Sequence, residues 1–500
     1  GMVLLWMTTV IPQARPPPCD HFSDSCRPPT TTQLLLLYSS FGLMSIGAGG
    51  IRSSAIAFGA DQLGKGDIMT EASILESYFS WYYVATSVAT ILSVTFIVYI
   101  QDNMGWNVGF GVPAILMFLA TLSFFLASSF YVKSKCNTSL LDGFAQVLVA
   151  SYRNRHVKLP SQDTREMYYH ITGSKLLMPS EKLRFTKEFV AALKVCSFRK
   201  YDNPCLSRFL NKACVIRNPK QDLTTEGRAT DPWRLCNVEQ VEELKSLFKV
   251  TPLWSTGIII SVTLFQDSIA VLLVKSMDRH IASKFEIPAG SFSVFLVISF
   301  TLWIALYKHV ILPLASKIKG QPARLSLKQK MGIGLLFGCL STAIFASVES
   351  LRREIAIQEG LVDIPQAMVS ISAMWLLPHY VLAGIGVAFN AIGQVEFYYS
   401  ELPTSMSSIA STLCGVGNSA GSLVASSIIS TVDDVTKRGG EESWVSSNIN
   451  KGHYDYYYWL LTGLSLANFV YFLACSKAYG PCEGEGMSKI LDEGNGVTDE

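Results

Sequence analysis

Nine stretches of this 500-residue chain are long enough and apolar enough to cross a lipid bilayer as helices. A spanning helix needs roughly 20 mostly apolar residues, because the hydrocarbon core of a bilayer is about 30 Å thick. The stretches are 34–60, 77–101, 103–132, 250–274, 287–307, 331–348, 372–400, 402–432 and 456–476. The sequence therefore predicts an all-α membrane protein that crosses the lipid bilayer many times.

Composition excludes two other classes of protein. Hydrophobic residues make up 49% of the chain and charged residues only 16%, whereas a soluble domain is about 25% charged. The 41 Lys and Arg residues barely exceed the 39 Asp and Glu residues, so the chain lacks the basic excess with which proteins bind nucleic acid. The 11 cysteines show neither a Cys-x-x-Cys pair nor the spacing of metal ligands. We therefore expect no metal, no cofactor and no nucleic-acid partner.

Charged residues divide the chain into four regions. The segment 133–249 holds 21 Lys or Arg and 12 Asp or Glu, which predicts a polar linker, and within it Glu181–Lys194 has the apolar spacing of an amphipathic surface helix. Two spans later the segment 308–330 carries only basic charges, and short basic loops mark the cytoplasmic side. We expect a transmembrane half at 1–132, a cytoplasmic linker at 133–249, a second transmembrane half at 250–476 and a cytoplasmic tail at 477–500.

The numbers of spans on the two sides of the linker are unequal. Met2–Ala14 resembles the end of a spanning helix more than a signal peptide, because no charged segment precedes it and no small-residue cleavage site follows it. With this segment, four spans precede the linker and six follow. Many transporters have two six-helix halves with the substrate site between them at mid-membrane, and such a protein without its first two helices would show this pattern. The alternative is a ten-helix protein without that symmetry.

Several motifs resemble those of a known family. They are Ile11–Cys19 (IPQARPPPC), Gly47–Gln62 (GAGGIRSSAIAFGADQ), Trp81–Tyr83, Val98–Gly105 (VYIQDNMG), Phe285–Phe295 (FEIPAGSFSVF), Ile392–Tyr398 (IGQVEFY) and Glu401–Pro403. In this order they resemble the plant nitrate transporter/peptide transporter family, a branch of the proton-coupled oligopeptide transporters in the major facilitator superfamily. The resemblance implies a helical bundle of the major facilitator type without enzymatic activity. It also implies an N-terminally truncated chain that starts within the third of twelve helices and contains about ten spans.

Arg52 and Glu396 are the most informative single residues. An ionisable side chain within a spanning helix is costly, so it usually faces inward and is paired, and each of these two is nearly alone in its span. Both occupy the fourth helix of their half, roughly 13 and 8 Å from the same cytoplasmic edge at 1.5 Å per residue. The resemblance implies that a basic residue and a Glu pair there during proton-coupled transport. We therefore expect Arg52 and Glu396 to form a proton-coupled gate; the alternative is an ion pair that only holds helices together.

Aromatic and apolar side chains are further candidates for the substrate cavity. They are Trp81, Tyr82 and Tyr83 in the fifth of the expected twelve helices, Leu264 in the seventh, Trp303 in the eighth and Tyr398 in the tenth. An interfacial aromatic belt is the competing explanation for the aromatic residues. His379 and Asp267 lie near the outer ends of their spans, where a structural role is the simpler interpretation.

Together these features predict a proton-coupled secondary transporter of a small anionic or zwitterionic solute such as nitrate, located in the plasma membrane. A peptide, a glucoside or an organic-acid hormone is an alternative substrate within the same family. The resemblance also weakens nitrate, because some nitrate-carrying members of the family have a His in the helix that corresponds to 250–274, and this segment contains none. A non-transporting scaffold or receptor is another alternative. Gly417–Gly421 spells the G-x-S-x-G pattern of serine hydrolases, but it lies inside an uncharged span instead of a strand-to-helix turn. This context argues against an intramembrane hydrolase.

Cys19 and Cys26 are candidates for a disulfide. They lie in a polar, proline-flanked loop that the predicted topology places outside the cytoplasm, where disulfides are permitted. Two free thiols are the alternative, because connectivity cannot be read from a sequence.

The topology can be tested with epitope tags. Even numbers of crossings separate the linker 133–249, the basic segment 308–330 and the tail from Lys477, so tags in all three regions should react from the same side of the membrane. A tag in 15–33 should react from the opposite side. Labelling of the linker and of 15–33 from one side would show that the number of predicted spans is wrong.

Overall fold

The computed structural model describes residues 1–16, 28–62, 78, 81–82, 85–132, 140–157, 159, 167–170, 178–180, 203–225, 227–264, 266–282, 285–320, 325–365, 367–438, 440 and 442–480. Cys19 and Cys26, and the predicted amphipathic helix Glu181–Lys194, lie outside these residues. Within them, nine helices are long and apolar enough to cross a membrane, and each overlaps one of the nine predicted stretches. The prediction of an all-α membrane bundle is confirmed.

The first group of helices precedes the linker. It contains α1 (Met2–Val10), α2 (Thr31–Asp61), the helical run Ala85–Met104, which passes through a π-helical turn (Ser93–Ile97) and ends in α4 (Val98–Met104), and α5 (Trp106–Leu126). The indole of Trp6 in α1 donates to the backbone oxygen of Asn107 in α5 (3.0 Å), so the short predicted tenth segment packs against α5. Gly105 has a φ of 84°, which favours glycine and permits the sharp turn between α4 and α5.

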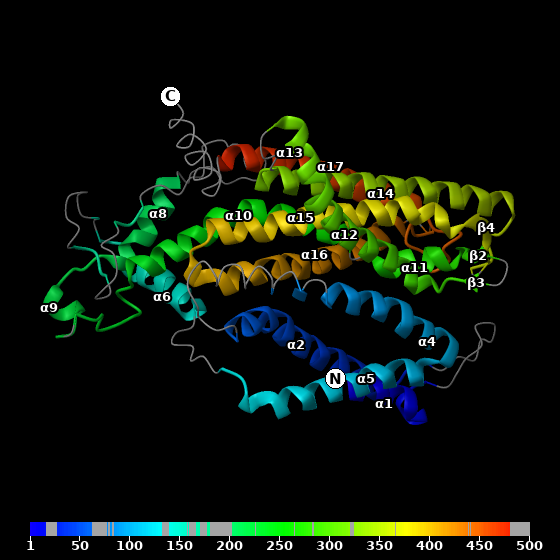
Figure 1. Ribbon diagram of the computed structural model, residues 1–500, viewed down its shortest axis with the longest axis horizontal. Coiled ribbons are helices and arrows are strands. Elements are labelled where there is room, and N and C mark those ends of the chain that lie inside the picture. The colour runs from blue at the N-terminus through cyan, green and yellow to red at the C-terminus, as the bar shows by residue number, and fades with distance from the viewer. Residues whose placement is uncertain are drawn as a thin grey trace.

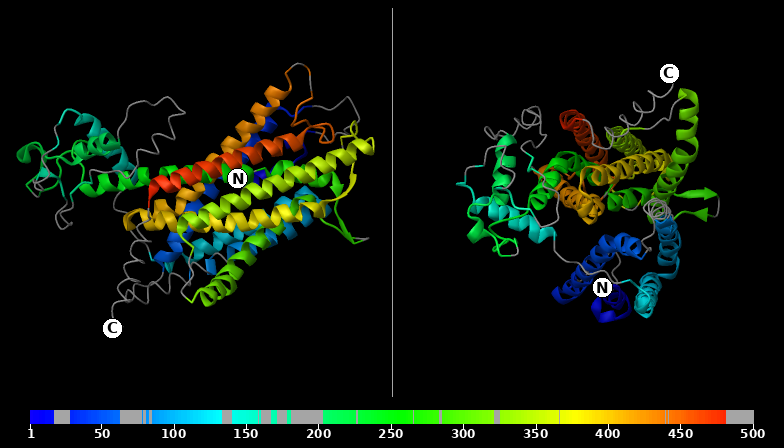
Figure 2. Two further views of the ribbon diagram at one scale, coloured as in Figure 1. Left: turned by 90° about the horizontal axis from the view of Figure 1, so that it is seen from above. Right: turned by 60° about the vertical axis from the view of Figure 1, so that its left-hand side comes forward.

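The second group of helices follows the linker and lies beside the first (Figures 1 and 2). It contains α10 (Val238–Leu264), α11 (Asp267–Lys275), α12 (Val294–Leu306), α13 (Leu312–Lys319), α14 (Leu327–Gln358), α15 (Leu377–Glu401), α16 (Ser407–Thr436) and α17 (Tyr454–Tyr479). A π-helical turn (Tyr307–Ile311) joins α12 to α13, and 3-10 helices (Ala289–Ser293, Ala373–Leu376 and Thr404–Met406) lead into α12, α15 and α16.

The two ends of the second group differ. At one end, β1 (Met277–Asp278) pairs in parallel with β4 (Val369–Ser372), and β2 (His280–Ala282) pairs antiparallel with β3 (Phe285–Glu286). At the other end lie the linker helices α6 (Leu140–Arg153), α8 (Asn203–Asn211) and α9 (Pro219–Asp222), on the left in Figure 1. Burial raises the pKa of the linker thiols Cys214 and Cys236 to about 12, so both stay protonated and unreactive at neutral pH.

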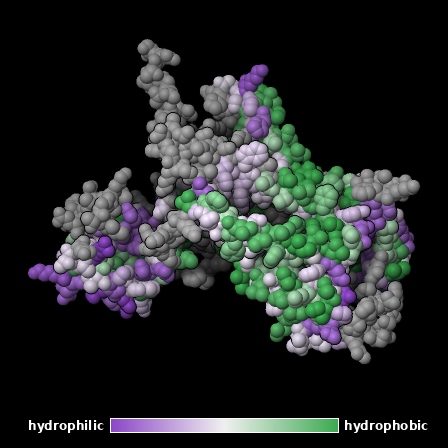
Figure 3. All heavy atoms as spheres, turned by 60° about the horizontal axis from the view of Figure 1, so that its bottom comes forward, coloured by the Kyte–Doolittle hydropathy of each residue, from purple (hydrophilic) through white to green (hydrophobic). Residues whose placement is uncertain are grey.

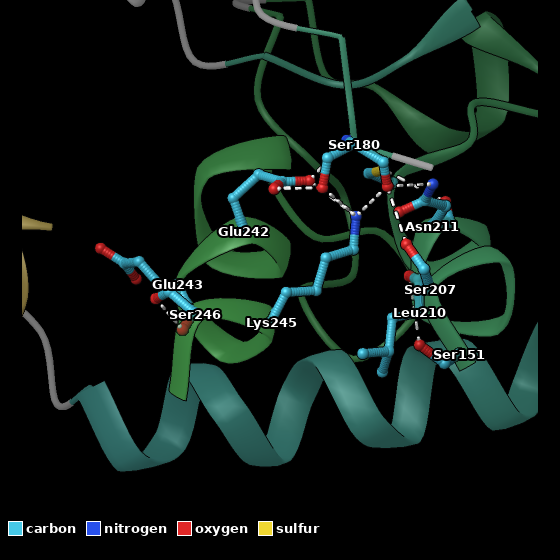
Figure 4. A network of polar contacts seen from close by, with 10 residues as sticks. Ser151, Ser180, Ser207, Leu210, Asn211, Glu242, Glu243, Lys245 and Ser246 are labelled. Carbon is cyan, nitrogen blue, oxygen red and sulfur yellow. Dashed lines mark hydrogen bonds and ion pairs between the residues drawn. The ribbon is translucent and has the colours of Figure 1, made fainter. Parts of the chain in front are cut away.

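Ser180 fastens the linker to α10 (Figure 4). Its backbone N–H and its hydroxyl both donate to the carboxylate of Glu242 (2.8 Å each), and its backbone oxygen accepts from the Lys245 ammonium (2.8 Å) and the Ser207 hydroxyl (2.8 Å). The Lys245 side chain is only 3% exposed and also pairs with Glu242 at 2.7 Å. Glu242 and Lys245 both belong to α10. Ser180 therefore attaches the linker to a helix that continues into the bundle.

Two helices extend beyond the predicted stretches. α10 begins at Val238, well before the predicted span 250–274, and α13 continues to Lys319 inside the segment 308–330 that we expected to form a basic loop. Apolar content marks where a helix can contact lipid, whereas backbone hydrogen bonds carry the same helix on through charged residues. Charge therefore marks the end of a predicted span but not the end of the helix.

The buried core and the apolar surface lie in different places. Among the described residues, two clusters of buried apolar side chains form the core, and both belong to the second group and the linker. Large apolar side chains on the first group are exposed instead, for example Leu35, Ile46, Phe118 and Phe125. Figure 3 shows hydrophobic residues spread over the helices, with hydrophilic ones at the linker end and also at the opposite end. This distribution fits helices whose outer faces contact lipid.

Glu349 and Arg352 form a buried ion pair near the end of α14. The guanidinium of Arg352 donates to both carboxylate oxygens of Glu349 (2.7 and 2.8 Å) and to the side-chain oxygen of Asn450 (2.7 Å). Neither Glu349 nor Arg352 is more than 2% exposed. The pair therefore ties α14 to the segment before α17.

Arg352→Ala should strongly destabilise the protein, because it leaves the Glu349 carboxylate buried without its cation, which typically costs roughly 3–5 kcal/mol. The double variant Glu349→Gln/Arg352→Met should lose less stability than Arg352→Ala, since it leaves no charge buried. Melting temperatures in detergent would measure both effects, with Arg438→Ala as a control at an exposed arginine. A melting temperature of Arg352→Ala equal to that of the control would contradict this assignment.

Candidate functional site

α15 carries the only carboxylate predicted to act in the second group, Glu396, on the side that packs against α14. Gly393 lies one turn earlier and makes this packing possible: a Cβ there would stand 3.0 Å from Met331 Cγ and 3.1 Å from Lys330 Cβ. These distances are tighter than ordinary contacts, so a larger residue would require Met331 or Lys330 to shift by a few tenths of an ångström. The sequence places a glycine at a close contact between α14 and α15, one turn before Glu396.

The start of α14 is fixed by a capping box. The Ser326 hydroxyl accepts from the backbone N–H of Gln329 (3.2 Å), and the Gln329 side-chain oxygen accepts from the backbone N–H of Ser326 (2.9 Å). Such reciprocal bonds satisfy two backbone donors at a helix start and hold its first turn in place. Lys330, the fourth residue of α14, is thereby held at a defined height beside α15.

Lys330 and Glu396 form the ion pair at the centre of the candidate site. The Lys330 ammonium lies 2.5 Å from Glu396 Oε2. The Lys330 side chain is 16% exposed, whereas that of Glu396 is 43% exposed. The carboxylate is therefore open to solvent on one side while its cation is mostly enclosed between helices.

Arg52, the predicted partner of Glu396, lies on α2 in the first group of helices. It is exposed, and it forms no ion pair with any residue that the structure describes. The structure does not bring Arg52 and Glu396 together; the carboxylate pairs instead with Lys330 from the neighbouring helix. Pairing of Arg52 with Glu396 stays a prediction for another arrangement of the two groups.

Lys330 is the site residue that the sequence analysis missed. It is one of several basic residues in the segment 308–330, for which the sequence alone predicts a cytoplasmic loop. The only local signal is the Ser326 and Gln329 capping pattern, which starts a helix before Lys330 and so places it inside the helix.

A buried ladder of polar side chains lies on α15 beside Glu396. The Gln394 amide donates to the Asn390 side-chain oxygen (2.6 Å), and the Tyr398 hydroxyl donates to the Gln394 side-chain oxygen (3.2 Å). Tyr398 is fully buried. The structure thus places this predicted cavity residue in the interior of the second group, where its hydroxyl is satisfied within α15.

The other predicted cavity residues lie in varied surroundings. Trp303 packs against Phe389 with ring centroids 5.6 Å apart, and its indole N–H is buried with no acceptor among the described residues. Trp81 is exposed and Tyr82 is half-buried. Tyr83 and the side chain of Leu264 lie outside the described residues. The cavity-lining roles of these residues stay predictions.

Glu401 and His379 have structural partners. The Glu401 side chain is fully buried, and it accepts from the Lys249 ammonium (2.7 Å) and the Tyr479 hydroxyl (2.6 Å), which joins the middle of α10 to the C-terminal ends of α15 and α17. The His379 ring lies 2.8 Å from the Ser341 hydroxyl on α14, as the structural interpretation of this residue expects. The side chain of Asp267 lies outside the described residues.

The G-x-S-x-G pattern is part of a helix interface. A Cβ on Gly421 would stand 2.4 Å from Ser261 Cβ, so α16 packs tightly against α10 at this glycine. The Ser419 hydroxyl donates to the backbone oxygen of Gly415 within α16 (3.0 Å). The serine lies in the middle of a helix, and a nucleophile elbow requires a strand-to-helix turn.

A cavity inside the second group is too small for a solute. It measures about 40 Å³ and is lined by residues that include Gln266, Ser341 and His379. A volume of this size holds a few water molecules, whereas small-molecule sites are typically about 300–1,000 Å³.

Comparisons with known proteins agree with this architecture. A sequence profile described as the POT family (PTR2) matches residues 1–445. The chain is 48% identical over 487 residues to protein NRT1/PTR FAMILY 1.2 of Arabidopsis thaliana, an alignment that covers 96% of this chain and 76% of that protein. Protein NRT1/PTR FAMILY 1.1 of the same plant is also 48% identical, over 96% of this chain and 78% of its own length.

Solved structures show the same fold. The crystal structure of the POT family transporter PepTSo superposes with a TM-score of 0.58 at 16% identity, covering 89% of this chain and 79% of that one. A POT family transporter in complex with 5-aminolevulinic acid superposes with a TM-score of 0.53 at 13% identity, covering 96% and 81% of the two chains.

Gly393→Ala should destabilise the protein by about 1–3 kcal/mol, because the added methyl group overpacks the contact between α14 and α15. Gly415→Ala is the matched control: it is also a helix-interior glycine, no atom lies within 4 Å of its Cβ position, and alanine favours helix by about 1 kcal/mol. In detergent, the melting temperature should fall in Gly393→Ala and should not fall in Gly415→Ala. Equal melting temperatures would mean that Gly393 does not set the helix spacing.

Proposed function

The chain belongs to the POT family and is related to its NRT1/PTR members, and on that premise we propose that it carries a small anionic or zwitterionic solute across the membrane by symport with protons. Proteins of this family are membrane transporters, so the chain is a multi-pass transporter and not an enzyme. Its location in the plasma membrane stays a prediction.

The exposed carboxylate of Glu396 in its ion pair with Lys330 is the observation that carries this proposal. Intramembrane ionisable residues are rare and mark proton or substrate pathways. Glu396 is 43% exposed, so protons can reach it, and protonation would cancel the charge that holds Lys330. A residue that is both accessible and charge-paired is suited to convert proton binding into a change of contacts.

Arg52 supplies a cation for the solute. It is exposed, and its guanidinium stays charged at all physiological pH values and can hold a planar anion with two hydrogen bonds. When the two groups of helices approach each other, Glu396 is the carboxylate with which Arg52 would pair. Either protonation of Glu396 or an anion bound at Arg52 would prevent that pairing. The proton and the solute would therefore both act on the same gate, which is the Arg52–Glu396 ion pair.

The charges of Arg52 and Glu396 limit the classes of solute that the site would accept. A cation in the first group and a carboxylate in the second fit a solute with one negative charge, with or without a separate positive one. Complexes of POT family transporters with a conjugated peptide and with 5-aminolevulinic acid have been solved, which supports zwitterions as one possibility. Nitrate fits the Arg52 guanidinium equally well, although 250–274 contains no His. A glucoside or an organic acid is the remaining alternative.

Glu396→Gln should abolish proton-driven accumulation and leave exchange of solute across the membrane measurable, because the amide mimics the protonated carboxyl group. Arg52→Ala should weaken apparent affinity about tenfold or more, the loss expected for a charge-assisted hydrogen bond, whereas Arg52→Lys should be tolerated. The measurement is uptake of nitrate, a dipeptide and 5-aminolevulinic acid into proteoliposomes with and without an inward proton gradient.

Arg438→Ala, at an exposed position, serves as the control and should take up solute like the wild type. Wild-type accumulation by the Glu396→Gln protein would place proton coupling elsewhere and overturn the proposed role of Glu396.

A further inference from the structure

We propose that the end of α13 binds the phosphate group of an anionic phospholipid, whose acyl chains lie along the exposed apolar side of α12 and α13. The inference concerns a lipid and not the transported solute, so it does not depend on the proposed function. It follows from the length of the helical run 294–319, from the side chains that this run exposes and from the two lysines at its end.

The helical run 294–319 is longer than the hydrocarbon core of a bilayer. It comprises α12, the π-helical turn and α13, and at 1.5 Å per residue it is about 39 Å long. The hydrocarbon core is about 30 Å thick, and at a tilt of about 20° the run still crosses about 37 Å. The α12 part carries no charge, whereas α13 ends at Lys317 and Lys319. The end of α13 is therefore the end that reaches the lipid headgroups.

α13 packs against little of the protein. Figures 1 and 2 show it at the edge of the second group of helices, and none of its residues is buried. Its contacts with other described elements are mainly with the π-helical turn that precedes it. Its surface is therefore available to the surrounding membrane.

Exposed apolar side chains form a stripe along the run 294–319. The stripe consists of Leu302, Leu306, Val310, Leu314 and Ile318, and each of these side chains is between 46% and 78% exposed. They follow one another at intervals of four positions, so they lie along one side of the helix. The stripe is long enough to accompany an acyl chain from the middle of the bilayer to its surface.

The stripe ends between two lysines. Ile318 is 78% exposed, and its neighbours Lys317 and Lys319 are exposed as well. A lysine at the end of a spanning helix extends its apolar stem along the acyl chains and its ammonium group into the headgroup layer. Lys317 and Lys319 therefore flank the position at which the phosphate of a lipid beside Ile318 would lie.

The charges of the segment 308–330 favour an anionic lipid. The segment contains six Lys or Arg residues and no Asp or Glu. Lys328 donates to backbone oxygens at the end of α17, and Lys330 pairs with the carboxylate of the candidate site. Lys317 and Lys319 form no ion pair with any residue that the structure describes. Their charges are thus free to attract the phosphate of an anionic lipid.

The C-terminal tail 481–500 is the competing partner of the two lysines. It contains six Asp or Glu residues and one Lys, so its charge would also complement Lys317 and Lys319. An acidic segment would neutralise the lysines but would leave the apolar stripe without a partner. A phospholipid satisfies both, because it combines a phosphate group with acyl chains.

Photochemical crosslinking identifies the neighbour of Ile318. The full chain, with p-benzoylphenylalanine in place of Ile318, is irradiated in nanodiscs of phosphatidylglycerol and phosphatidylcholine that have identical acyl chains and are mixed in the ratio 1:3. Mass spectrometry then counts the adducts of each lipid. Each lysine near an anionic surface strengthens binding about fivefold. We therefore expect the ratio of phosphatidylglycerol to phosphatidylcholine adducts to exceed that of the bilayer about tenfold or more.

The same probe in place of Leu302 is the matched control. Leu302 lies on the same stripe and is 57% exposed, but it is far from both lysines along the helix. Its adducts should show the lipid ratio of the bilayer. The comparison of the two positions needs no further substitution, so it does not depend on whether a lysine variant folds.

Variants of the lysines test which charges are responsible. With the probe in place of Ile318, Lys317→Gln/Lys319→Gln should return the adduct ratio to that of the bilayer, whereas Lys317→Arg/Lys319→Arg should keep the enrichment. Lys437→Gln/Arg438→Gln removes two exposed basic residues just after α16 and should leave the enrichment unchanged.

Three results would overturn the inference. The first is an adduct ratio at position 318 equal to that at position 302. The second is undiminished enrichment in Lys317→Gln/Lys319→Gln. The third is a crosslink from position 318 to the tail 481–500 or to a second copy of the chain in place of a lipid, which would show that protein covers this surface.

Discussion

A charge enclosed by apolar helices requires an opposite charge within contact distance, and this constraint organises the second group of helices. Glu349 pairs with Arg352, Glu396 with Lys330 and Glu401 with Lys249. The first and last of these carboxylates are almost fully buried, whereas Glu396 is partly open. The first pair therefore ties α14 to the segment before α17, and the last ties α10 to α15. The carboxylate of the Glu396 pair is the one that stays partly exposed.

Much of the fold could be predicted from the sequence because transfer of a helix into lipid depends on local composition. Nine uncharged or nearly uncharged stretches each became a spanning helix. The ends of the helices could not be predicted in this way. α10 begins at Val238 among charged linker residues, because the backbone hydrogen bonds of a helix do not depend on whether its side chains face lipid or water.

The candidate site could be predicted only in part. Arg52 and Glu396 stand out because each interrupts an apolar stretch. Lys330 does not, since it lies among other basic residues at the edge of its stretch, and its importance comes from the close contact of α14 with α15 at Gly393. Such a contact joins residues far apart in the chain, so no local sequence pattern predicts it. Tyr398 shows the same limit, because hydropathy does not reveal which side of a helix faces the core.

Because α10 is continuous, the linker is attached to a part of this helix that extends beyond the bundle, and a small tilt of the helix would move the linker. The part of the helix from Val238 to Lys249 is about 18 Å long at 1.5 Å per residue, so a tilt of about 10° would carry its tip about 3 Å. Pro252 lies just beyond this part and lacks the N–H that would brace a helix there, which makes it the natural pivot. Ser180 clamps the linker to the outer arm through Glu242 and Lys245. The linker is thereby coupled to the orientation of a membrane helix.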